Sequence, residues 1–248
     1  MTSVLEFLVV VLVSCGAALA IAWIVERVRE HGAHRPDDDR VGVKIGAAFA
    51  VYGVVLGFAV VVAQQSYADS ESAVRSEMGA VISTVNVALA LPPAQGEPIV
   101  ADMRRYLEAE IASWEDLGSS DIKTASTAAI RVAYVDTQAL SADPSASAAQ
   151  AAIFANLAAV DSSRADRVLL FHARFSPFMW ALLFGGGILV IAMMSLLHFD
   201  SRVLRLGLLF GMASLIGVAL FTTWAFSQPF SGPIPISSAA LAHVLNSL

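Results

Sequence analysis

Four long stretches of this chain contain no Asp, Glu, Lys or Arg, and this feature constrains the fold more than any other. The stretches are residues 7–25, 45–63, 175–199 and 206–248. The hydrocarbon core of a bilayer is about 30 Å thick, so about 20 helical residues cross it. A hydrophobic fraction of 57% is also too high for a soluble domain. We therefore predict transmembrane spans at residues 4–25, 42–64, 177–198 and 203–226.

The spans are expected to be helices, because their apolar residues show no period of two and four segments cannot close a β-barrel. The predicted fold class is an all-α integral membrane protein with an extramembrane antiparallel helical bundle inserted between spans two and three. The predicted domains are residues 1–64 with two spans and a short cytoplasmic loop, 65–174 with the extracytoplasmic bundle, 175–228 with spans three and four, and 229–248 with a Pro/Gly turn and a short amphipathic tail.

The first apolar run could instead be a cleaved signal, cut after "ALA" at 18–20, or a lipoprotein signal with "LVSC" at 12–15. Both need a basic residue before the apolar run, and residues 1–7 offer only Glu6. We expect an uncleaved anchor. Cys15 is the only cysteine, which excludes an intrachain disulfide, and we expect it to pack as a small apolar group.

Short loops orient a membrane protein through their Lys and Arg. The basic residues of the two short loops and their margins are Arg27, Arg29, Arg35, Arg40 and Lys44 in one, and Arg202 and Arg205 in the other. Both loops are therefore expected in the cytoplasm, with both chain ends and residues 65–174 outside it. That long segment carries fourteen acidic against eight basic residues.

Helical spacing of apolar residues predicts the bundle. Span two should continue as one helix through Val74, Met78, Val81, Val85 and Leu89. A second helix should start with Pro98 in its first turn and stop at Gly118, a third should start at Asp121, and a fourth should be capped by Asp143 before Pro144. In the tail, Ser237 should cap a helix over residues 238–246. That helix should fold back on the membrane surface or on the base of the bundle.

Several kinds of chemistry lack sequence support. The apolar cores of the spans hold no ionisable residue, which argues against ion-coupled transport. Phosphate-binding, zinc-protease and nucleophile-elbow motifs are absent from the sequence, so we expect neither an enzyme nor a cofactor. No basic patch with interleaved aromatic residues indicates a nucleic-acid partner. His31, His34 and Asp37 to Asp39 have metal-ligand chemistry, but Gly32 and Pro36 favour a solvated loop, and we expect no metal there.

Small residues recur at helical spacing in spans two and four. The candidates for a pore or helix-packing seam are Gly46, Gly53, Gly57, Gly207 and Gly211. Small side chains let helix backbones approach closely, either within one molecule or at an oligomeric or pore-facing seam, and both interpretations stay open. Three consecutive glycines, Gly185 to Gly187, are expected to mark a soft or kinked point.

The chain resembles the bestrophin-like domain family, a membrane domain of unknown function found in bacteria and plants. The residues that carry the resemblance are Gly53-x-x-x-Gly57-Phe58 running into Ser76-Glu77, Leu91-Pro92 with Tyr106, Glu110 and Trp114, Arg164-x-x-Arg167, Pro177 with Trp180, and Pro229-Phe230-Ser231-Gly232. The family usually has an acidic residue two positions before that last proline, whereas Ser227 stands there in this chain. The family name implies likeness to oligomeric anion channels.

Two functions remain open. The first is a homo-oligomeric, anion-selective channel, in which Arg164 and Arg167 attract an inorganic anion. Alternatively, both arginines pair with acids of the bundle such as Asp161 and Asp166. The second function is a membrane-anchored interaction or sensory module without transport activity. Tyr106 and Trp114 would then contact a partner, although core or membrane-interface positions explain them equally well.

Overall fold

The computed structural model describes most of the chain beyond residue 37. The described residues are Val9, Gly16, Ala20, Trp23 and Arg27 singly, and the segments 38–114, 122–140, 144–172, 175–197 and 201–248. Apart from four of those single positions, the predicted first span at residues 4–25 lies outside them, as does Cys15. The loop with His31, His34 and Asp37 also lies outside the described residues.

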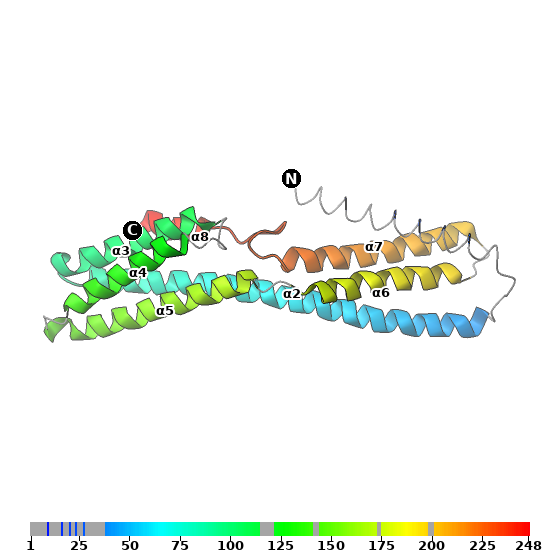
Figure 1. The fold of residues 1–248 in the computed structure, drawn as a ribbon, viewed down its shortest axis with the longest axis horizontal. Helices are drawn as coiled ribbons and strands as arrows, with labels where there is room; N and C mark the ends of the chain where they lie inside the picture. Colours follow the sequence, from blue (N-terminus) through cyan, green and yellow to red (C-terminus); the bar gives the residue numbers. More distant parts are fainter. Residues whose placement is uncertain are drawn as a thin grey trace. The chain divides into compact units, whose positions relative to one another are not determined.

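The described segments are helical, with no strand among them, which confirms the all-α fold class for this part of the chain (Figure 1). The elements are α2 (Asp38–Leu89), α3 (Pro93–Ala112), α4 (Ile122–Ala139), the 3₁₀ helix η3 (Pro144–Ala146), α5 (Ser147–His172), α6 (Pro177–Leu196), α7 (Arg202–Phe226) and α8 (Ala239–Ser247). They form two compact units: a membrane unit from residues 1–66, 175–228 and 232–234, and a bundle unit from residues 67–174, 229–231 and 235–248.

Three described helices are long and apolar enough to cross a membrane: Ile45–Leu89, Pro177–Leu196 and Val203–Phe226. The last two agree with the predicted third and fourth spans within two residues. Their starts are set by N-caps, because the side chains of Ser176 and Ser201 accept hydrogen bonds from backbone amides three residues ahead. Leu56, Leu183 and Leu209 belong to the apolar core that joins the three helices of the membrane unit.

Helix α2 is continuous over 52 residues, as the sequence predicts. At 1.5 Å per residue it is about 78 Å long, more than twice the thickness of a hydrocarbon core. Only part of it can therefore lie in lipid. Its residues up to Ser66 belong to the membrane unit and those from Tyr67 belong to the bundle unit.

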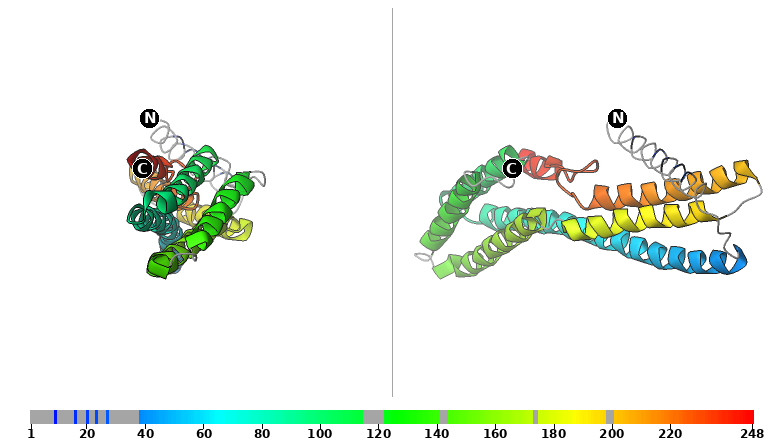
Figure 2. Two further views of the ribbon diagram at one scale, coloured as in Figure 1. Left: turned by 90° about the vertical axis from the view of Figure 1, so that its left-hand side faces the viewer. Right: turned by 45° about the vertical axis from the view of Figure 1, so that its right-hand side comes forward.

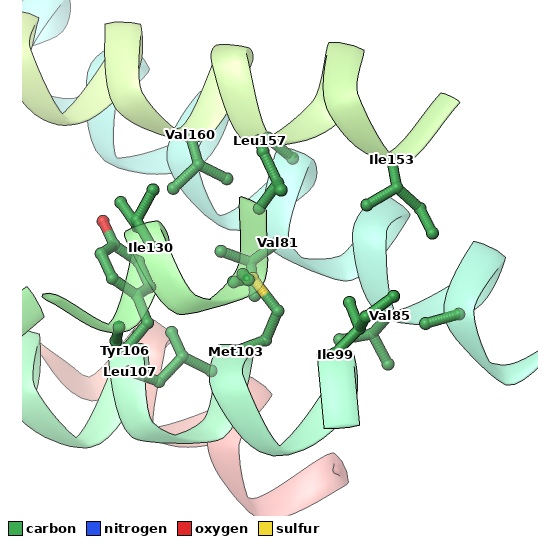
Figure 3. Packing of buried hydrophobic residues seen from close by; sticks show 14 of the residues in the cluster. Val81, Val85, Ile99, Met103, Tyr106, Leu107, Ile130, Ile153, Leu157 and Val160 are labelled. Atoms are coloured by element: carbon green, nitrogen blue, oxygen red, sulfur yellow. The ribbon is translucent and has the colours of Figure 1, made fainter. Parts of the chain in front are cut away.

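The bundle unit is built around one apolar core. Figure 3 shows residues of this core from α2, α3, α4 and α5: Val81, Val85, Ile99, Met103, Leu107, Ile130, Ile153, Leu157 and Val160. Helix α3 packs against both α4 and α8 (Figure 2). Leu241 and Val244 of α8 are buried in the same core, so the predicted fold-back of the tail ends in the bundle core.

Several predicted helix ends are wrong. Helix α3 starts at Pro93 rather than near Pro98, because a proline in the first turn loses no hydrogen bond. Gly96 allows the tight turn before it, since a Cβ there would lie 2.1 Å from the carbonyl oxygen of Ala88. The helix ends at Ala112, six residues before Gly118.

The caps of the later helices also differ from the prediction. The N-cap of α8 is Ser238 rather than Ser237, and its side chain makes no capping hydrogen bond. The fourth helix of the bundle begins with the 3₁₀ turn η3 before α5. The predicted cap Asp143 and the predicted start Asp121 lie outside the described residues, and α4 is described from Ile122.

Candidate functional site: a buried ion-pair network

Charged and aromatic side chains from different helices meet inside the bundle unit. Helix α2 contributes Glu77, α3 contributes Tyr106 and Glu110, and α5 contributes Arg164 and Arg167. All of these except Arg164 are at least 98% buried. Charged side chains are rarely buried unless they are paired, so this network is the most unusual chemistry in the described structure.

Arg167 lies at the centre of the network and its side chain is fully buried. Its Nε donates to Glu77 Oε2 at 2.7 Å and its Nη2 donates to Glu77 Oε1 at 3.1 Å. The same Nη2 also donates to Glu110 Oε2. Burial alone would lower the pKa of Arg167, but the two carboxylates outweigh burial and raise it. The guanidinium therefore stays charged.

Glu110 is shared between the two arginines. Arg164 Nε donates to Glu110 Oε1 at 2.7 Å, and the other nitrogens of Arg164 donate to Thr127 Oγ1 at 3.0 Å and Ser126 Oγ at 2.8 Å. Burial raises the pKa of Glu110, but Arg167 and Arg164 together lower it by more, so the net shift of the pKa is downward. Through Ser126 and Thr127, the network also fixes α4.

Tyr106 completes the coordination of Glu77. Its hydroxyl donates to Glu77 Oε1 at 2.5 Å. Burial, reinforced by the charges of Glu77 and Glu110, raises the pKa of the Tyr106 hydroxyl well above its usual 10. The Tyr106 hydroxyl therefore keeps its proton and remains a hydrogen-bond donor at physiological pH.

Trp114 connects the network to the tail. Its ring lies 5.1 Å from Cζ of Arg167, and Nη1 of Arg167 has no nitrogen or oxygen partner among the described residues, so the ring face takes the place of an acceptor. Trp114 Nε1 donates to the carbonyl oxygen of Ile236 at 3.0 Å. The ring of Phe230 stands edge-on to Trp114 with 5.9 Å between centroids and also contacts Phe171.

The structure thus gathers most of the family-motif residues named from the sequence. Glu77, Tyr106, Trp114, Arg164, Arg167 and Phe230 share this one site in the bundle unit, and Pro229 O accepts a hydrogen bond from the Ile236 amide at 2.7 Å. Gly232 belongs to the membrane unit. A Cβ at Gly232 would be 2.6 Å from the carbonyl oxygen of Gln228, so only glycine fits this turn.

The structure decides between interpretations that the sequence left open. Both arginines pair with acids of the bundle, but these acids are Glu77 and Glu110 rather than Asp161 and Asp166. Tyr106 is 0% and Trp114 7% exposed, so both are core residues, which is one of the interpretations that the sequence left open, and neither is available to a partner protein. Glu110 was named from the sequence only as part of the family resemblance, and its pairing with both arginines was not foreseen, although its position four residues after Tyr106 places both on one helix face.

The two arginines and two glutamates balance in charge. Removing either kind would leave uncompensated charge in a medium of low permittivity, which makes the four groups interdependent. The described residues contain no group of three or more His, Cys, Asp or Glu that could hold a metal. Chemically, the arrangement joins helices and fixes their register.

The glycines of the predicted seam lie elsewhere, in the membrane unit. Gly46, Gly53, Gly57, Gly207 and Gly211 are exposed, and a Cβ on any of them would meet no described atom within 4 Å. The described residues therefore give no packing partner for the seam within one molecule.

The glycine triplet in α6 has a different role from the predicted soft point. Helix α6 runs through it without a break. A Cβ on Gly186 would lie 2.6 Å from the Tyr52 ring, and one on Gly187 would lie 3.0 Å from the Tyr52 hydroxyl. That hydroxyl donates to the carbonyl oxygen of Leu183 at 2.9 Å. The glycines provide a flat surface on which Tyr52 of α2 lies.

Comparisons with known proteins agree on one family. Residues 12–241 match the model of the Bestrophin-like domain. A crystal structure of a variant of a bacterial bestrophin homologue from Klebsiella pneumoniae aligns with a TM-score of 0.76 and 10% identity, over 98% of this chain and 97% of that chain. A second variant gives 0.74 and 9%, over 97% of both chains. A crystal structure described as a membrane protein gives 0.74 and 8%, over 97% of this chain and 96% of that chain. At these identities the likeness concerns the fold. No curated protein matches significantly.

Proposed function

The chain belongs to the Bestrophin-like domain family, and we propose that this membrane protein forms a homo-oligomeric channel for small inorganic anions in the cell membrane. The observation that carries the proposal is the uncovered face of α2 in the membrane unit. Fold likeness to bestrophin homologues supports it.

Of the three candidate spans, the one in helix α2 is the least covered by other parts of the protein, since only 17% of its most apolar window is buried. Its exposed side chains include Val51 at 67%, Val54 at 57% and Phe58 at 68%, and Gly53 and Gly57 lie among them. One protomer has too few helices to enclose a water path, so further copies must supply the rest of the wall. Exposed glycines would let neighbouring helices approach closely.

We propose that an apolar constriction, rather than a ring of arginines, favours anions. Arg164 and Arg167 are neutralised by Glu77 and Glu110, which argues against their serving as anion attractors. Between Ile45 and Ala63, α2 carries no Asp, Glu, Lys or Arg. A path lined by such a helix favours large monovalent anions, which lose their water more easily than small cations and can pass a hydrophobic constriction.

Flux measurements on purified protein in liposomes test the proposal. Phe58→Ala should raise iodide or chloride efflux several-fold, because the largest exposed apolar side chain of α2 in the membrane unit would no longer narrow the path. Phe178→Ala on α6 is the matched control, since Phe178 is 77% exposed on another span and should leave efflux unchanged. A monomer in mild detergent, or liposomes that stay tight at every protein density, would refute the channel.

One observation favours the second function, a membrane-anchored interaction module. A hollow of about 680 Å³ opens on the surface of the bundle unit. Its lining residues are Thr127, Asp161, Arg164, Ala165, Val168, Leu169 and His172. Mixed polar and apolar walls of this kind suit a protein or small-molecule partner. An oligomer without flux that loses a partner upon Leu169→Asp would support this function instead.

A further inference from the structure

A second pair of acidic side chains lies away from the arginine network, where α3 packs on α4. Asp102 of α3 is 0% exposed, and Asp136 of α4 is half-buried. Asp102 stands between Ile99 and Tyr106 on the face of α3 that enters the core of the bundle unit. A carboxylate in such a position needs hydrogen-bond donors to remain ionised.

Asp102 lacks those donors. Neither of its carboxylate oxygens accepts a hydrogen bond from the described residues. Arg105 Nη1 lies 2.8 Å from Asp102 Oδ1, which makes an ion pair without hydrogen-bond geometry, and the Arg105 side chain is 59% exposed. Helix α3 packs on α4 at this position, and the carboxyl of Asp136 on α4 is close enough to act on Asp102. Two carboxylates can form a hydrogen bond only if one of them carries a proton.

We propose that Asp102 and Asp136 share one proton, and that release of this proton loosens the contact between α3 and α4. The pair acts as a proton-operated switch inside the bundle. When the proton is present, Asp102 has a hydrogen-bonded neighbour in the core. When it is absent, two negative charges face each other and the buried one lacks a donor. The switch does not depend on the protein being a channel.

The electrostatic environment agrees in direction. Burial raises the pKa of Asp102 from 3.8 to about 6, Asp136 raises it further, and Arg105 opposes both. Those two residues are the charged groups that act on Asp102. An acid whose folded pKa is raised binds its proton more tightly in the folded state. Its stabilising effect is therefore complete below about pH 4, falls as the pH rises toward 6, and is absent above that.

Hydrogen exchange of the purified full-length protein between pH 4.5 and 7.5 tests the switch. Protection factors of the α3 and α4 amides, corrected for intrinsic exchange, should fall by up to about tenfold per pH unit up to pH 6 and then level off. Asp102→Asn keeps the shape of the protonated acid, so its protection should fall less steeply with pH than that of the wild type. Glu108→Gln removes an exposed acid of the same helix and should keep the wild-type profile.

The Asp102→Asn variant separates this effect from the arginine network. In that network the pKa of Glu110 is lowered, so its contribution is lost as the pH falls below about 4.5, whereas burial raises the pKa of Glu77, which titrates alike in wild type and variant. A flat wild-type profile, or an Asp102→Asn profile equal to wild type, overturns the proposal. If Asp102→Asn does not fold, Asp136→Asn replaces it. Without the neighbouring charge, the transition should move to lower pH, and an unmoved transition overturns the proposal too.

Discussion

A single side chain, Arg167, decides whether the bundle unit can hold two buried glutamates. Glu77 and Glu110 are 1% and 2% exposed, and both depend on its guanidinium. Burying a charge is costly unless the charge is paired, and breaking a buried pair costs more than the pair contributes. The network therefore selects one register of the helices, because any other register would leave buried charges unpaired.

We expect Arg167→Met to destabilise the protein by about 3–5 kcal/mol, because it leaves the buried Glu77 without a cation and Glu110 with Arg164 alone. The measurement is the free energy of unfolding in mild detergent. Arg75→Met is the matched control: Arg75 pairs with Glu71 at 2.6 Å, but both side chains are exposed, so the loss should stay below about 1 kcal/mol.

A combined variant separates charge from packing. Adding Glu77→Gln to Arg167→Met removes the stranded carboxylate, keeps the pair of Arg164 and Glu110, and should recover much of the lost stability. Equal destabilisation by Arg167→Met and Arg75→Met would contradict the importance of burial at this site.

At the scale of helices, the contact between α2 and α6 depends on which glycine of the triplet faces Tyr52. Gly186 lies beneath the Tyr52 ring, whereas Gly185 is exposed and a Cβ there meets no described atom within 4 Å. Adjacent residues in a helix point about 100° apart, so the same substitution at Gly185 and at Gly186 should affect stability differently.

We expect Gly186→Ala to destabilise the membrane unit by about 1–3 kcal/mol, because the new Cβ would overlap the Tyr52 ring. Gly185→Ala should be neutral or slightly stabilising, since alanine favours the helix over glycine. Thermal unfolding of the two variants in detergent compares them directly. If both behave alike, Tyr52 does not rest on the triplet.

Helix content and spans were predictable because their signals are local. The uncharged runs predicted the ends of α6 and α7 within two residues. The absence of proline between span two and Pro92 indicated a continuous α2. The start of α3 was not predictable in this way, because two prolines compete and the tight approach of Gly96 to Ala88 decides between them. The hydrogen bond from Tyr52 to Leu183 was also missed, since these two residues are 131 positions apart in the sequence.

The buried network was predictable only in its membership. Its residues stand out as polar positions within apolar helical stripes, and the resemblance marked most of them. Their pairing depends on sequence separations of 54 to 90 residues, as between Arg164 and Glu110 or Arg167 and Glu77. Patterns within one helix contain no information on such distances, so nearby aspartates were favoured instead.

For the whole molecule, the proposed orientation places the bundle unit outside the cytoplasm. In a Cys15→Ser background, Ser145→Cys at the exposed η3 turn should react with a membrane-impermeant maleimide in intact cells. Ser201→Cys, exposed between α6 and α7, should react only after lysis, because Arg202 and Arg205 favour retention of this loop inside. Labelling in the reverse pattern would show that the protein has the opposite orientation.

The position of α8 has a consequence for biosynthesis. Leu241 and Val244 complete a hydrophobic core whose other members precede the two last spans in the chain. During translation, the bundle helices emerge first, yet their core stays open until the ribosome has made α6, α7 and the tail. A nascent chain halted before α8 would expose apolar surface to chaperones and proteases, so completion of membrane insertion and maturation of the bundle are linked in time.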